Sequence, residues 1–122
     1  MSERLIRDFC EAWSRKDIDE LLGYFTEDAV YHNMPLDPAR GHEAIRNVMM
    51  LFVPLANDIE FEIKNLAEAG NVVLTERVDR FVMEGGTIEL PVMGVFEVQG
   101  GKIKAWRDYF DMATWTNQMP KP

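Results

Sequence analysis

Hydrophobic residues recur at helical spacing through the first half of the chain. The first such series predicts a helix that ends near Lys16 and contains Leu5, Ile6, Phe9, Cys10 and Trp13. Asp17 is expected to cap a second helix, with Glu20 three residues on as its capping-box partner. The apolar stripe of this second helix consists of Ile18, Leu21, Leu22 and Phe25.

A short strand and a third helix are expected next. The strand passes through Val30 and Tyr31, and the prolines of segment 34–38 predict a loop after it. Gly41 then leads into the third helix, whose inner face consists of Ile45, Val48, Met49 and Phe52.

Beyond Pro54 hydrophobic and polar residues alternate, which is typical of a half-buried strand. The alternation begins in segment 59–64, and three more strands are expected, separated by Gly70-Asn71, Gly85-Gly86 and Gly100-Gly101. Helices followed by consecutive strands predict one α+β domain over residues 1–122. We expect a strongly curved, mixed or antiparallel sheet with the N-terminal helices packed on one face, enclosing a cone-shaped apolar pocket.

Composition limits what such a domain can bind. With 47% hydrophobic residues, 122 residues can form a core without cross-links, and the single cysteine, Cys10, excludes an internal disulfide. The net charge of -8 argues against nucleic acid or an anionic membrane as a partner. No long apolar run occurs, and the two histidines lie on different predicted elements. The chain is therefore expected to be soluble and cytoplasmic, without a membrane span or a metal site.

Polar side chains interrupt the apolar faces of three predicted strands. Arg77 and Asp79 lie two apart in segment 72–82, so both point to the face that carries its apolar residues. Asp108 lies in the same way among the aromatic residues of segment 102–110, and Tyr31 and Asn33 share one face of the first strand. Because buried charges are costly unless they are paired, five polar groups directed at an apolar interior indicate a functional site.

Each of these residues has an ordinary structural interpretation when it is taken alone. Arg77 and Asp79 could form a structural ion pair, and Tyr31 could be a core phenol. Asn33 could be a turn residue before Pro35. The joint occurrence of the whole set favours catalysis, because independent structural needs would seldom reproduce it.

Longer stretches of the chain resemble known families. The scaffold is similar to the nuclear transport factor 2 superfamily through Trp13, Asp17, Leu21, Phe25, Asp28 and segment 41–45. Segments 31–35, 76–79 and 101–111 resemble limonene-1,2-epoxide hydrolases. This resemblance implies hydrolysis of an apolar, limonene oxide-like epoxide by water in one step, without metal, cofactor or covalent intermediate. It also implies Asp108 as general base, Asp79 as general acid, Arg77 as the bridge between them, and Tyr31 and Asn33 as partners of the water.

Epoxide opening needs these residue types on chemical grounds as well. One carboxyl group must give a proton to the departing oxygen while another activates a water molecule. Two carboxyl groups close together in a poorly solvated pocket tend to share one proton, and a guanidinium between them fixes their geometry. The apolar substrate is expected to lie among Trp13, Phe52, Phe81, Leu90, Val92, Phe110 and Trp115.

Two alternatives stay open. A ketosteroid-isomerase-like or polyketide-cyclase-like enzyme on the same scaffold would use a carboxylate to abstract a proton, but it would not need Arg77 between two acids. A binding module would hold a ligand in the pocket without turnover. Loss of Arg77 separates the first alternative from the hydrolase, since an isomerase should tolerate it far better.

A homodimer is expected from the face of the sheet that the helices leave uncovered. On two of its strands this face mixes apolar and charged residues, namely Leu74, Glu76, Val78, Arg80, Met93, Val95 and Glu97. Arg107 and Asp111 point away from the Asp108 face and are assigned to the surface or to this interface. The resemblance also implies a dimer.

Overall fold

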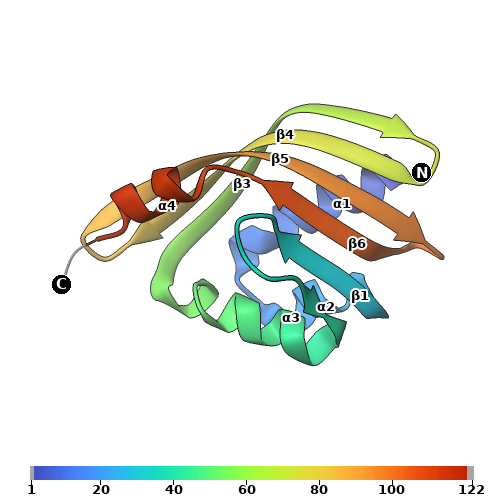
Figure 1. Cartoon of the computed structure of the whole chain (residues 1–122), viewed down its shortest axis with the longest axis horizontal. Helices are drawn as coiled ribbons and strands as arrows, with labels where there is room; N and C mark the ends of the chain where they lie inside the picture. The colour runs from blue at the N-terminus through green and yellow to red at the C-terminus, as the bar shows by residue number, and fades with distance from the viewer. Residues whose placement is uncertain (1, 121–122) are drawn as a thin grey trace.

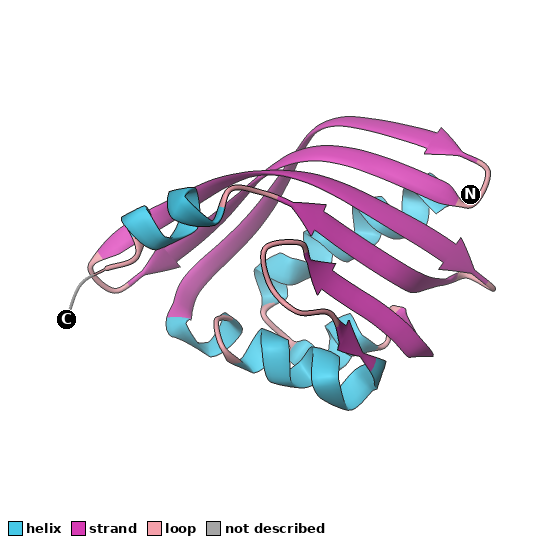
Figure 2. Ribbon diagram, in the orientation of Figure 1, coloured by secondary structure: helices cyan, strands magenta, loops and turns pink. Residues whose placement is uncertain are grey.

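The computed structural model describes residues 2–120, and in this range six strands form one mixed sheet in the order β2-β1-β6-β5-β4-β3. The N-terminal helices lie on one side of this sheet, as Figures 1 and 2 show. The helical elements are α1 (Ser2–Ala12), η1 (Trp13–Arg15), α2 (Ile18–Leu22), α3 (Gly41–Met50), η2 (Val53–Leu55) and α4 (Met112–Gln118). The strands are β1 (Phe25–Asn33), β2 (Ala39–Arg40), β3 (Ala56–Ala69), β4 (Val72–Met83), β5 (Gly86–Gln99) and β6 (Lys102–Tyr109).

The helix signals at the N-terminus are largely confirmed. The first helical segment ends at Lys16, which has a left-handed φ of 54°, and the Asp17 side chain accepts a hydrogen bond from the backbone of Glu20. The Glu20 carboxylate binds Arg15 at 2.6 Å, so the capping-box role expected for its side chain is wrong. Phe25 was expected on the second helix, but that helix ends at Leu22, and Phe25 begins β1 and is buried there.

The strand signals are confirmed in the second half of the chain. β3, β4, β5 and β6 are joined by three consecutive antiparallel connections at the expected glycine pairs. Gly85, between β4 and β5, has a φ of 94°, which residues with a side chain rarely adopt. Burial alternates along β4 as its sequence predicts, with Arg77 and Asp79 in the buried row. The structure also contains two elements, β2 and α4, that the sequence did not predict.

A parallel pairing of β1 with β6 brings the two halves of the chain together. Its register places Tyr31 beside Trp106 and Asn33 beside Asp108. Trp106 is fully buried and stacks on Tyr31, with ring centroids 4.2 Å apart. Phe9 of α1 meets the same indole edge-on at 5.1 Å, so the core between helices and sheet is centred on Trp106.

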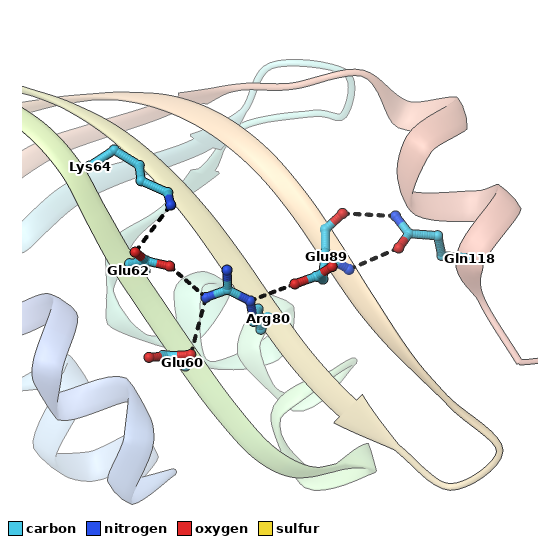
Figure 3. A network of polar contacts seen from close by, with 6 residues as sticks. All are labelled: Glu60, Glu62, Lys64, Arg80, Glu89 and Gln118. Atoms are coloured by element: carbon cyan, nitrogen blue, oxygen red, sulfur yellow. Dashed lines mark hydrogen bonds and ion pairs between the residues drawn. The ribbon is translucent and has the colours of Figure 1, made fainter.

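The other face of the sheet carries a chain of ion pairs. Arg80 of β4 binds Glu62 at 2.8 Å and Glu89 at 2.6 Å, and it also reaches Glu60 (Figure 3). Gln118 of α4 bonds both the backbone N–H and the backbone C=O of Glu89, which holds α4 against β5 (Figure 3).

None of the described helices is both long enough and apolar enough to cross a lipid bilayer. Cys10 is buried in the core, where burial raises the pKa of its thiol to about 12. This position fits the small buried apolar role that its helical spacing predicts.

Candidate active site

Arg77 binds two buried aspartates at once. Its Nε and Nη2 donate to the two carboxylate oxygens of Asp79, at 3.0 and 2.8 Å. Its Nη1 and Nη2 donate to the two oxygens of Asp108, at 3.2 and 2.8 Å. All three side chains are at most 5% exposed, so each carboxylate is paired with the same desolvated cation.

Two further residues hold this arrangement, and neither was among the expected site residues. The indole N–H of Trp106 donates to Asp108 Oδ1 at 2.6 Å, and Nη1 of Arg77 also donates to the hydroxyl of Thr75 at 3.1 Å. Thr75 lies two residues before Arg77, and Trp106 two residues before Asp108, each on the buried face of its strand. Strand alternation is therefore the signal that could have identified both.

Tyr31 and Asn33 lie next to the aspartates, as expected. The parallel register sets Asn33 directly beside Asp108, and the backbone N–H of Met34 donates to the Asp108 carbonyl at 2.9 Å. Stacking on Trp106 fixes the ring of Tyr31, which is buried. The five residues expected from the sequence thus come together from β1, β4 and β6.

A cavity of about 220 Å³ opens onto this cluster. The polar residues that line it are Tyr31, Asn33, Asp79 and Asp108. The apolar residues that line it are Leu36, Val48, Leu51, Phe52, Phe61, Phe81, Leu90, Val92, Phe110, Met112, Trp115 and Met119. Arg77 does not line the cavity, so it can act on a bound molecule only through the carboxylates in front of it.

Six of the seven apolar residues expected around the substrate line the cavity. The exception is Trp13, which is fully buried and stacks on Phe61 at 4.7 Å, so Phe61 and not Trp13 is in contact with the cavity. Helix α4, which Gln118 fastens to β5, contributes Met112 and Trp115 to the wall.

Comparison with known proteins decides the family. The limonene-1,2-epoxide hydrolase catalytic domain matches residues 1–121. This chain belongs to the limonene-1,2-epoxide hydrolase family. It is 33% identical over 109 residues to the epoxide hydrolase EphG of Mycobacterium tuberculosis, a match that covers 88% of this chain and 71% of EphG.

Solved structures agree with this assignment. An M. tuberculosis LEH-like epoxide hydrolase superimposes with a TM-score of 0.78 at 30% identity, covering 95% of this chain and 86% of that one. A putative SnoaL-like polyketide cyclase from Shewanella denitrificans gives a TM-score of 0.86 at 16% identity, covering 96% and 95%, which shows the fold alone. The fold is the nuclear transport factor 2-like one, and the protein is an epoxide hydrolase of the limonene-1,2-epoxide hydrolase family.

The electrostatics of the cluster follow from the burial of two carboxylates around one cation. Burial raises the pKa of Asp79 from 3.8 to about 6, although the charge of Arg77 opposes the increase. Burial by itself lowers the pKa of Arg77, but Asp108 and Asp79 outweigh it and hold that pKa well above its usual value. Burial, together with the charge of Asp108, raises the pKa of Tyr31, which keeps its phenol protonated.

Neither histidine belongs to this site. His32 Nε2 lies 2.9 Å from the carbonyl oxygen of Leu36, and His42 Nε2 lies 3.1 Å from that of Phe25. Across residues 2–120, no group of three or more His, Cys, Asp and Glu side chains could hold a metal ion.

Asp79 is expected to make folding stability fall as the pH rises from about 4 to 7. Its folded-state pKa is raised, so the folded hydrolase holds a proton that the unfolded chain has released. The stabilisation is therefore complete below the ordinary pKa and is lost as the pH rises through about 6, with a slope of at most about 1.4 kcal/mol per pH unit. Urea unfolding of the natural protein and of Asp79→Asn across this range isolates the effect. The free energy of unfolding of the natural protein, minus that of Asp79→Asn, should fall across this range. A value that stays constant or rises with pH would contradict the prediction.

Proposed function

We propose that this enzyme converts an apolar cyclic epoxide, of the limonene oxide type, to a vicinal diol by direct attack of water. The observation that carries the proposal is the double bridge of Arg77 to Asp79 and Asp108 at the wall of an apolar cavity. The cone-shaped enclosure by a curved sheet, expected from the sequence, is part of the same proposal.

Asp108 is the general base in this mechanism. It lines the cavity beside Asn33, and Tyr31 lines it on the same strand as Asn33. A carboxylate oxygen, an amide oxygen and a phenol together can orient one water molecule. As Asp108 takes a proton from this water, the water oxygen forms a bond to one carbon of the epoxide. Holding the reactants in this geometry lowers the barrier by several kcal/mol, on the order of what oriented intramolecular reactions gain.

Asp79 is the general acid. Its pKa, raised by burial to about 6, keeps more of it protonated near neutral pH than an ordinary aspartate would be, and it lines the same cavity. As the carbon–oxygen bond of the epoxide breaks, Asp79 gives its proton to the departing oxygen. Asp108 then holds a proton and Asp79 is ionised, so one proton must return to Asp79 before the next turnover. Arg77 bonds to both carboxylates and holds them in place while this proton changes sides.

The cavity walls favour an apolar ring. Aromatic and aliphatic side chains surround the four polar groups, and a rigid hydrocarbon ring gains free energy when it leaves water for such a surface. The substrate-binding residues of this proposal are Phe52, Phe81, Leu90, Val92, Phe110 and Trp115, together with Phe61.

The variants Asp79→Asn and Asp108→Asn should each reduce diol formation by about a hundredfold or more, since each removes one proton-transfer group. The assay is incubation with racemic limonene oxide and cyclohexene oxide, followed by chiral chromatography of the diols. Arg77→Lys should be severely impaired as well, because an ammonium group cannot bridge two carboxylates as a planar fork does.

Circular dichroism provides the folding control for these three variants, and Asp37→Asn in the exposed loop is the matched surface variant. Near-normal turnover by either aspartate variant would refute the assignment. An Arg77→Lys enzyme that forms diol at nearly the natural rate would show that the bridging role is wrong. A natural protein that binds the epoxides without forming diol would be a binding module.

A single turnover in oxygen-18 water, with enzyme in excess over epoxide, should place the label in the diol. Direct attack delivers the oxygen of water, whereas an enzyme ester would deliver an unlabelled carboxylate oxygen in the first turnover. Mass spectrometry of the product separates the two routes. Unlabelled first-turnover diol would show that a covalent intermediate forms.

We also propose a homodimer through the uncovered face of the sheet. Leu74, Met93 and Tyr109 expose 42%, 49% and 47% of their surface there. Arg80 already binds acidic partners within its own chain, and Arg107 binds Glu97 at 2.7 Å. Because these charged residues already have partners within the chain, the exposed apolar residues are the part of the face whose burial in an interface would gain the most free energy.

Light scattering at micromolar concentration should report about twice the monomer mass of 14.1 kDa. Met93→Glu should shift the protein toward the monomer, because it places a charge within the apolar part of the face. Leu55→Glu, at an exposed apolar residue outside the sheet, is the matched control and should stay dimeric. A natural protein that runs as a monomer would refute the proposal.

A further inference from the structure

Gly94 lies in the inward-facing row of β5, directly below the bridge between Arg77 and Asp108. The neighbours in this row are buried apolar residues, Ile88, Leu90, Val92 and Phe96. Gly94 pairs with Thr75 of β4 on one side and with Asp108 of β6 on the other. It is thus the point of β5 over which a side chain of β4 meets one of β6.

The backbone of β5 does not itself require glycine at this position. Gly94 is not among the glycines with a positive φ, so an alanine could adopt its conformation. Glycine in the interior of a strand weakens that strand, because it has no side chain to pack and loses more entropy on folding. The reason for glycine must therefore lie in the space above it.

That space is filled by the bridge. A Cβ atom at Gly94 would overlap Nη1 of Arg77, and it would lie 2.7 Å from Oδ1 of Asp108 and 2.9 Å from Oγ1 of Thr75. β4 and β6 flank β5, so the backbones that carry Arg77 and Asp108 are about 10 Å apart. The guanidinium must cross β5 to reach Asp108, and it crosses at Gly94.

We propose that Gly94 is a positioning residue of the hydrolase, which by lacking a side chain lets Arg77 hold Asp108. The inference rests on the proposed function in so far as Asp108 is the base. A methyl group at this position separates the guanidinium from Asp108, whereas no apolar residue of the cavity wall is among the atoms that it would meet. The loss should therefore appear in the chemical step and not in substrate binding.

Gly94→Ala is expected to lower kcat for diol formation by about tenfold or more. KM should stay within about twofold, because the apolar wall that holds the substrate is intact. Gly86→Ala is the matched control, since Gly86 lies in the same strand, has no positive φ, and a Cβ there would meet nothing within 4 Å. It should leave kcat and KM unchanged. Full kcat in Gly94→Ala would overturn the proposal.

A double-mutant cycle on stability tests the contact independently of turnover. Gly94→Ala should lower the urea midpoint clearly in the natural protein but much less in the Arg77→Lys background, because lysine places no second terminal nitrogen over β5. If Gly94→Ala alone fails to fold, folding of the double variant gives the same answer. An equal loss in both backgrounds, or failure of both to fold, would refute the contact. If the natural enzyme forms no diol, the proposed function fails, and this cycle still decides the role of Gly94.

Discussion

One guanidinium shared by two buried carboxylates is the interaction on which the rest of the site depends. Removing charges from water costs several kcal/mol per ion, and the attraction between them compensates only when their hydrogen bonds are satisfied. Arg77 satisfies both aspartates and also binds Thr75. One cation cannot neutralise two ionised carboxylates, and in the proposed mechanism a proton on Asp79 balances the charge of the site. Balanced charge in a dry site is thus the physical constraint that would let two residues of the same type serve as the proposed acid and base.

The same core residue serves stability and the site. Trp106 is packed against Phe9, Tyr31 and Phe96, and its indole N–H is directed at Asp108. The aromatic core therefore fixes the direction of the carboxylate that the proposed mechanism uses as base. A change in core packing around Trp106 would move Asp108, which means that stability and catalysis cannot be adjusted separately at this point of the fold.

Sequence periodicity predicted which face each residue occupies but not which residues meet across the sheet. Alternation in β4 correctly placed Arg77 and Asp79 inside, because side-chain direction is a local property of a strand. The crossing at Gly94 depends on the register of β4, β5 and β6, which no single strand encodes. Helix α4 was missed because it is only seven residues long, contains two threonines and lacks a side-chain cap. Its position is set by tertiary contacts, chiefly those of Gln118 with β5.

The two aspartates differ in their surroundings in the sense that the proposed roles require. Asp108 accepts N–H bonds from Arg77 and from Trp106, whereas Asp79 accepts them from Arg77 alone. The indole N–H of Trp106 is therefore a fixed donor at Asp108 that Asp79 lacks. Burial raises the pKa of Asp79, which is the direction that the proposed general acid requires. Two residues of the same type thus stand in different surroundings, and the hydrogen bond that distinguishes them comes from a residue that also packs the core.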